Sequence, residues 1–275
     1  MLDPTWQSPY VPSPAERHVN ERAVRRFVIR KRIPQTVAAG VLAVALIVGV
    51  FVVAWLPALG IAVALLYAFD LRRSLAGYER RGQSLGAVML EQFEEGGTSK
   101  DRQRLVTVID RLAATFGVNA VNAFIVEDPG YNAALVPNGD DFSLFVTSAL
   151  MSDFELIELE GVVAHCLARQ RLGLLSRESV ASATPLSDEN RLLLSGAGMA
   201  YRADEIAAAA IRYPLGLAGA LRKCAAKPVP RDSFFATPKF NDWRWIWFDV
   251  WCDRAQRDLG DLDDVEIRAL ALEEW

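Results

Sequence analysis

The chain has 275 residues and a net charge of −4, and 52% of its residues are apolar. The slightly acidic balance argues against a general nucleic-acid binder. Its three cysteines are widely spaced and form no CxxC pair, which argues against a disulfide framework and favours a reducing compartment. Only His18 and His165 are present, so a site with two imidazoles would need His18, which precedes a long apolar segment.

The first 75 residues change character twice. Residues 1–16 contain four prolines and little apolar periodicity, and we predict that they form a disordered tail. Residues 17–32 are rich in arginine, and residues 33–69 contain no charged side chain. This apolar run starts too far into the chain, and is too long, for a cleaved signal peptide.

The length of the apolar run indicates how it would cross a membrane. As one helix it would extend roughly 55 Å, against about 30 Å of hydrocarbon in a bilayer. A helical hairpin fits better, with a turn near Trp55, Leu56 and Pro57. Basic residues flank both ends, so the positive-inside rule places both ends in the cytoplasm. A single tilted span would instead place the larger domain outside.

Beyond the apolar run the pattern is mainly helical. Ser152 and Glu155 fit a capping box at the start of the helix that carries His165. Trp243, Trp247 and Trp251 would share one stripe of a Trp-rich helix. For this stripe we favour a position in the protein core over one at a membrane interface. The other predicted elements are helices at 70–116 with a break at 96–99, strands at 121–126 and 143–147, a turn at 137–140, a polar connection at 173–190, a helix at 191–213, another through 223, and a final helix near 263–274.

Residues 160–169, Glu-Gly-Val-Val-Ala-His-Cys-Leu-Ala-Arg, carry the most informative pattern. In zinc peptidases, a helix with His-Glu-x-x-His presents two imidazoles one turn apart, and its glutamate is the general base. Here His165 stands at the first histidine, Cys166 at the glutamate and Arg169 at the second histidine. The pattern is that of a metallopeptidase helix that has lost most of its chemistry.

Four segments, in this order, carry a likeness to one family. Residues 121–133 resemble a strand that ends in a Pro-x-x-Asn-Ala turn, and 145–150 a Val-Thr-x-Gly-Leu edge. Residues 158–165 resemble a Glu-Leu-x-x-Val-Leu-Ala-His helix, and 201–204 a Glu-Phe-x-Ala-Asp stretch. Together they resemble the HtpX-type membrane-anchored zinc metallopeptidases. The resemblance implies an α+β fold: a mainly helical gluzincin-like metallopeptidase domain with a small β-sheet, plus an N-terminal transmembrane helical hairpin.

The resemblance also implies where zinc would be held. Family members use both histidines of the motif and a glutamate just before an Ala-Asp pair, and those positions here are His165, Arg169 and Ala200. A positive charge about 5 Å from a dication costs roughly 6–7 kcal/mol at an effective dielectric constant of about 20. A full ligand set is worth roughly 10–16 kcal/mol. Losing two ligands and adding that repulsion should abolish zinc binding, so we expect no cofactor.

Each residue of this degenerate site also has a plain structural interpretation. His165 is either a former ligand or a core histidine with one hydrogen-bond partner, and the second is favoured. Cys166 is a nucleophile if Arg169 lowers its pKa, and otherwise a small buried apolar residue. Asp204, which matches the family's aspartate after alanine, and Glu205 are either remnants of the site or surface acids. Because a buried charge needs a partner, we predict an ion pair between Arg169 and Asp204.

The sequence therefore predicts a non-catalytic pseudopeptidase, anchored in the plasma (inner) membrane of a bacterium, with its main domain facing the cytoplasm. Residues 1–16 would form the tail, 17–75 the basic segment and hairpin, and 76–275 the metallopeptidase-like domain. The expected partners are the lipid bilayer and other membrane proteins or an active peptidase paralogue, and no nucleic acid. The alternatives are an active zinc endopeptidase of membrane protein quality control with substitute ligands, and a thiol hydrolase that uses Cys166.

Overall fold

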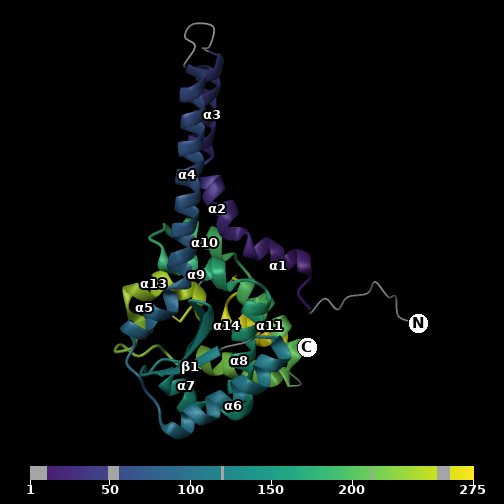
Figure 1. Ribbon diagram of the computed structural model, residues 1–275. Coiled ribbons are helices and arrows are strands. Elements are labelled where there is room, and N and C mark those ends of the chain that lie inside the picture. Colours follow the sequence, from purple (N-terminus) through teal and green to yellow (C-terminus); the bar gives the residue numbers. More distant parts are fainter. Residues whose placement is uncertain (1–10, 49–55, 119–120, 212, 253–260) are drawn as a thin grey trace, which may run out of the picture. The chain divides into compact units, whose positions relative to one another are not determined.

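The computed structural model describes residues 11–48, 56–118, 121–211, 213–252 and 261–275 (Figure 1). The chain forms two compact units. Residues 22–80 make the smaller unit, and residues 1–21 together with 81–275 make the larger one. Most of the predicted N-terminal tail lies outside the described residues, and helix α1, Pro14–Glu21, belongs to the larger unit.

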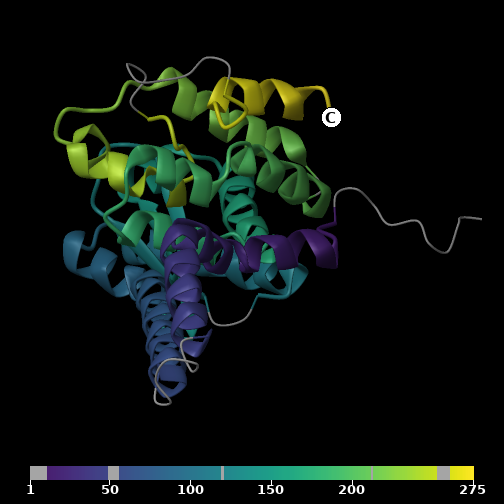
Figure 2. The same cartoon turned by 90° about the horizontal axis from the view of Figure 1, so that it is seen from above.

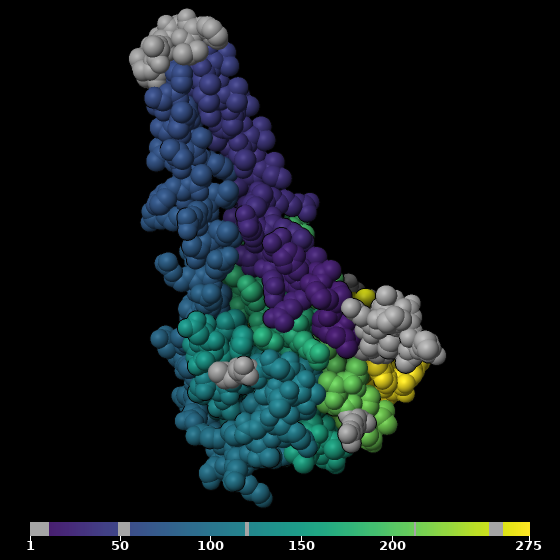
Figure 3. Space-filling view, turned by 45° about the vertical axis from the view of Figure 1, so that its right-hand side comes forward, coloured from purple at the N-terminus to yellow at the C-terminus, as the bar shows by residue number. Residues whose placement is uncertain are grey.

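The smaller unit is a helical hairpin. Helices α2, Ala23–Lys31, and α3, Ile33–Val48, pack antiparallel to α4, Leu56–Gln83 (Figures 1 and 3). The Oγ1 atom of Thr36 lies 2.6 Å from the hydroxyl of Tyr67. Nearer the tip, a Cβ on Gly60 would come 2.8 Å from the backbone oxygen of Ala43, so glycine is what allows the helices to approach there.

The predicted turn of the hairpin falls partly outside the described residues. Trp55 is not described, whereas Leu56 and Pro57 already form the first turn of α4. Proline is favoured in that position because the first helical N–H groups have no intrahelical partner. In the described ranges no helix by itself is long and apolar enough to cross a membrane, although α2 and α3, bent by 59°, pass that test as a pair.

The larger unit contains a three-stranded sheet in the order β1-β3-β2. Strand β1, Val121–Val126, runs parallel to β3, Asp141–Thr147, and β2, Ala133–Asn138, runs antiparallel to β3. Strands β1 and β3 lie where the sequence predicts strands. Strand β2 was not predicted, because Pro137 and Asn138 indicate a turn; the turn itself is Gly139 and Asp140, where Gly139 has a φ of 65°.

Helix α8, Leu156–Arg171, is the centre of the larger unit. Nearly all of its side chains from Glu158 to Arg169 are buried, because α6, α11, α12 and β2 pack around it (Figure 2). Gly161 lets α12 approach, since a Cβ there would lie 2.7 Å from the Cα of Leu217. The other helices of this unit are α5, Leu85–Gln92, α6, Ser99–Phe116, α7, Ser148–Asp153, α9, Leu175–Ala183, α10, Asp188–Ser195, α11, Met199–Ala210, α12, Pro214–Ala226, α13, Pro238–Trp243, and α14, Val265–Glu273.

A mainly helical α+β fold is therefore confirmed, but three local predictions were wrong. The capping box that opens α8 joins Glu155 and Glu158 rather than Ser152 and Glu155. The predicted polar connection contains α9, most of which is buried. The predicted helix at 191–213 is two helices, α10 and α11, separated by Gly196 and Gly198 with φ of 83° and 73°. Glycine adopts these positive φ values without the steric cost that other residues have.

The Trp-rich segment is also not the continuous helix that was predicted. Helix α13 ends at Trp243, a 3₁₀ turn covers Arg244–Ile246, and Trp247 has extended backbone. Trp247 forms a bridge with Ala134 of β2, and the amide of Phe248 donates to the oxygen of Ala133 at 2.7 Å. Trp247 is fully buried, so these residues are core and lie along the outer edge of β2.

Candidate functional site

The side chains of the broken motif are all buried in the larger unit. His165, Cys166 and Arg169 lie on α8 with exposed fractions of 0%, 0% and 2%. Burial raises the pKa of the Cys166 thiol to about 12, although Arg169 and Arg268 oppose that rise. Desolvation thus outweighs the nearby positive charge and disfavours a thiolate at Cys166. Cys166 packs in the main apolar cluster as a small core residue.

His165 faces a buried ion pair formed by Asp204 on α11 and Arg268 on α14. Its Nδ1 atom lies 2.7 Å from Oδ1 of Asp204. Arg268 binds both carboxylate oxygens of Asp204, at 2.5 Å from Nε and 3.0 Å from Nη2, and donates from Nη1 to the oxygen of Phe248 at 2.7 Å. The ring of Phe248 packs edge-on against His165, with 5.0 Å between ring centroids. This fork-like pairing is the geometry in which arginine binds carboxylate most strongly.

Electrostatics fix the protonation of this cluster. Burial alone would raise the pKa of Asp204, but Arg268 and His165 outweigh it and hold that pKa below its usual range. Burial lowers the pKa of His165 from 6.5 to about 4, although Asp204 opposes the shift. Because an ionised carboxylate only accepts hydrogen bonds, Nδ1 of the neutral His165 donates to Asp204. The Nε2 atom is then an acceptor, and it has no hydrogen-bond partner among the described residues.

Acid should destabilise the larger unit through His165. The imidazole of His165 binds a proton near pH 6.5 in the unfolded chain but only near pH 4 in the folded chain. The contribution of neutral His165 to the free energy of unfolding is therefore fully present above pH 6.5 and is lost as the pH falls toward 4. At about 1.4 kcal/mol per pKa unit, the loss is roughly 3 kcal/mol. Denaturant unfolding at several pH values measures it. His165→Asn, which cannot titrate, should flatten the dependence between pH 6.5 and 4.5; an unchanged slope would contradict this assignment.

Arg169 does not pair with Asp204, so that prediction was wrong. Its Nη2 atom lies 2.9 Å from Oε2 of Glu178 on α9, and its Nε atom donates to the same oxygen at 3.1 Å. The remaining N–H groups of Arg169 donate to backbone oxygens of the Trp-rich segment, those of Trp245, Ile246 and Trp247. Arg169 therefore does have a buried acidic partner, but its guanidinium faces α9 and residues 245–247.

The remaining site positions have structural roles. The backbone N–H of Ala200, where the family has its glutamate ligand, donates to Oδ1 of Asp263 at 2.8 Å, and that of Gly198 donates to Oδ2 at 2.8 Å. Asp263 therefore satisfies free N–H groups at the start of α11. Glu205 does not join the buried cluster, since it pairs with Arg202 at 2.7 Å.

Sequence reasoning missed Glu178 and Arg268, the two charged residues that complete the site. A signal for Arg268 was present: Val265, Arg268, Ala269 and Leu272 recur at helical spacing, and all four are buried on α14. A charged residue on an apolar helical face is almost never fully buried unless it is paired. That position should have indicated a buried ion pair.

The residues present do not fit the zinc ion that the family resemblance implies. In the parts of the chain that the structure describes, no group of three or more His, Cys, Asp or Glu side chains could hold a metal. Around His165 the charged groups include two arginines, Arg169 and Arg268, whose positive charges both disfavour protonation of the imidazole. They would repel a dication in the same way.

A comparison with models of known protein families finds no match, and a comparison with curated proteins finds none either. The resemblance to HtpX-type peptidases therefore depends on the four segments quoted above.

Proposed function

We propose that the chain is a non-catalytic, membrane-anchored pseudopeptidase of HtpX-type, gluzincin-like ancestry that binds or scaffolds other membrane proteins. The observation that carries this proposal is the pair of buried arginines. Arg169 stands at a former ligand position and binds the chain's own backbone, and Arg268 binds Asp204 on the other ligand helix, α11. The hydrogen bond between His165 and Asp204 joins α8 to α11, the two helices that zinc would bridge in the family, and the ion pairs tie them to α9 and α14.

The edges of the sheet support the same conclusion. An extended peptide can bind a protein by adding itself as a strand to an exposed sheet edge. Here residues 247–248 bond to β2, and on the other side Glu95 forms a bridge with Val126 of β1. The amide of Gly96 also donates to the oxygen of Ile125 at 2.9 Å. At these positions the chain's own segments take the hydrogen bonds that a peptide would need.

Membrane anchoring is supported by the surface of the hairpin. Large contiguous apolar patches are rare on soluble proteins and indicate contact with a membrane or a partner. The charge-free parts of α3 and α4 carry large apolar side chains that are each 42–69% exposed: Ile33, Val37, Val41, Leu42, Val44, Ile47, Val48, Leu59, Ile61, Leu65, Leu66 and Phe69. With basic residues at both ends of the hairpin, the larger unit would face the cytoplasm beneath the inner membrane. Other membrane proteins or an active peptidase paralogue are the proposed partners.

One observation favours the alternative of an active zinc peptidase with substitute ligands. The buried Nε2 atom of His165 is an acceptor without a partner among the described residues, which is the atom that a metal would bind. The two arginines weigh against it, since desolvated positive charges beside a dication oppose binding.

The proposal predicts that the purified full chain binds no stoichiometric zinc and does not cleave casein when zinc is added. The reason is that one imidazole beside two buried guanidinium groups cannot replace three ligands. Elemental analysis and a casein-degradation assay measure both quantities. His165→Ala is the control. A wild-type chain with one zinc, lost in that variant, would overturn the pseudopeptidase assignment in favour of the active enzyme.

A further inference from the structure

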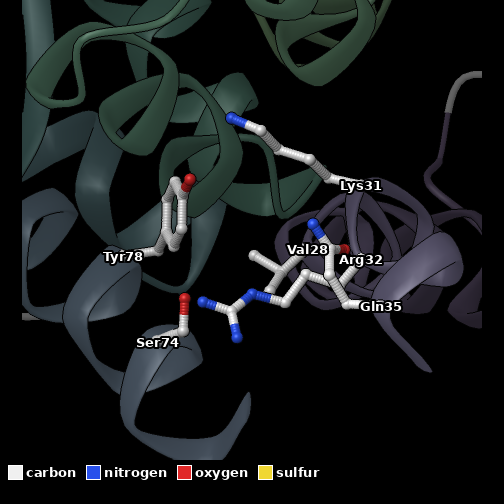
Figure 4. Close-up of a pocket in the computed structure, with 6 residues that line it drawn as sticks. All are labelled: Val28, Lys31, Arg32, Gln35, Ser74 and Tyr78. Carbon is white, nitrogen blue, oxygen red and sulfur yellow. The ribbon is translucent and has the colours of Figure 1, made fainter. Parts of the chain in front are cut away.

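A cavity of about 440 Å³ lies within the hairpin unit, between α2, the start of α3 and the middle of α4. Figure 4 shows the Arg32 guanidinium and the Ser74 hydroxyl close together, with Lys31 and the Tyr78 hydroxyl on the far side of Val28. Its lining residues are Val28, Lys31, Arg32, Gln35, Ser74 and Tyr78.

The lining of this cavity is rich in unused hydrogen-bond donors. Lys31 is exposed and makes no ion pair with any described residue. Arg32 binds Asp70 through Nη1, which leaves its other N–H groups available. Among the described residues, the hydroxyls of Ser74 and Tyr78 make no hydrogen bond to another side chain. Two cations and two hydroxyls around one space are the chemistry that recognises a phosphate group.

The cavity also borders the apolar surface of the hairpin. Ile33 follows Arg32 directly and is 51% exposed, and Phe69, which directly precedes the Asp70 partner of Arg32, is 64% exposed. A ligand that fills the cavity and continues along α3 and α4 would need a charged head and a long apolar tail. Free phosphate has no such tail, so the adjoining surface favours a lipid.

The charge of the unit matches an anionic ligand. Residues 22–80 contain nine basic and two acidic side chains, whereas the whole chain has a net charge of −4. The positive charge is therefore concentrated in the unit that holds the apolar helices. Basic clusters beside membrane helices bind anionic lipid head groups in this way.

We propose that this cavity binds the phosphate of an anionic phospholipid whose acyl chains lie along α3 and α4. Lys31 and Arg32 neutralise the phosphate, Tyr78 and Ser74 donate hydrogen bonds to it, and Val28 packs beneath it. This inference rests on the proposed membrane anchoring and adds to it a specific lipid site.

The test uses the full chain in nonionic detergent, titrated with phosphatidylglycerol or phosphatidylcholine, with bound lipid counted by native mass spectrometry. Phosphatidylglycerol should bind more tightly. Lys31→Gln should weaken it by about fivefold, as expected for one basic residue near a lipid phosphate, and Tyr78→Phe by about threefold, as expected for one hydrogen bond. Arg30→Gln is the matched control: it removes the same charge one residue earlier, outside the cavity lining.

Each other outcome overturns the proposal. Equal losses in Lys31→Gln and Arg30→Gln would mean diffuse attraction rather than a site. Equal binding of the two lipids, or displacement of phosphatidylglycerol by an equal concentration of inorganic phosphate, would mean that the site does not recognise a lipid.

A separate measurement tests the anchoring itself. Ala15 and Leu90 are exposed and all three native cysteines are buried, so cysteines introduced at 15 and 90 can be labelled against a low background. In membrane vesicles both should react from the same side. Labelling from the same side, without a preference for phosphatidylglycerol, would rule out the lipid site alone. Labelling from opposite sides would rule out the hairpin anchor and with it the proposed orientation.

Discussion

Replacing Asp204 by alanine should lower the free energy of unfolding by about 3–5 kcal/mol, the cost of leaving one member of a buried ion pair without its partner. Arg268 is fully buried and binds Asp204 through two nitrogens. In the variant its remaining contacts among the described residues would be the oxygen of Phe248 and, at 3.4 Å, Nδ1 of His165, and neither carries a negative charge. His165 would also lose the carboxylate that accepts its Nδ1 proton. Denaturant unfolding at pH 7 measures the change.

Two further variants make this result specific. Glu273 binds Arg222 at 2.7 Å on the surface, where water screens the charges, so Glu273→Ala should leave stability nearly unchanged. Adding Arg268→Leu to Asp204→Ala should recover part of the loss, because it removes the buried charge that the first change leaves unpaired. If Asp204→Ala costs no more than Glu273→Ala, the pair does not hold α11 and α14 together.

Local sequence signals predicted the parts of the fold that depend on neighbouring residues. Helix α8 and strands β1 and β3 lie where periodicity places them, because each pattern is complete within a few residues. Strand β2 has no such pattern, since Pro137 and Asn138 favour a turn, and its pairing with β3 overrides that preference. The break between α10 and α11 was not predicted, although Gly196 and Gly198 lie within the predicted helix and supply the positive φ values of the break.

The candidate site was predicted only in part, and the reason is sequence distance. His165, Arg169 and Asp204 were identified as buried site positions from the motif and the resemblance. Their partners were not, because Arg268 is 64 residues beyond Asp204 and the polar segment around Glu178 resembles a surface connection. A buried charge needs a partner because it has lost its contacts with water. Which partner it finds depends on how distant segments pack together, and a local sequence pattern does not contain that information.

Arg169 brings a charge into the interior of the larger unit. A buried charge must be neutralised and hydrogen-bonded. Glu178 supplies the charge, and the backbone of residues 245–247 supplies the acceptors. The same contacts hold the Trp-rich segment beside β2, so Arg169 links the packing of α8 to the closed sheet edge.

Replacing Arg169 by leucine should therefore have two effects. The free energy of unfolding should fall by about 3–5 kcal/mol, because Glu178 would be left buried without its partner. The Trp-rich segment should also detach more readily from β2, because three of its backbone oxygens would lose their donor. Arg171→Leu, the same chemical change on a partly exposed residue of α8, should cost about 0.5 kcal/mol or less.

Hydrogen exchange separates these two effects of Arg169→Leu. The amide of Phe248 donates to Ala133 of β2 and reports docking of the segment, whereas the amide of Leu167, deep in α8, reports global unfolding. In Arg169→Leu, protection of Phe248 should fall below that of Leu167. Adding Glu178→Leu should recover stability by removing the unpaired acid, yet Phe248 should remain less protected than Leu167. If protection of both amides falls equally and recovers together, Arg169 only neutralises Glu178 and does not hold the segment on the sheet edge.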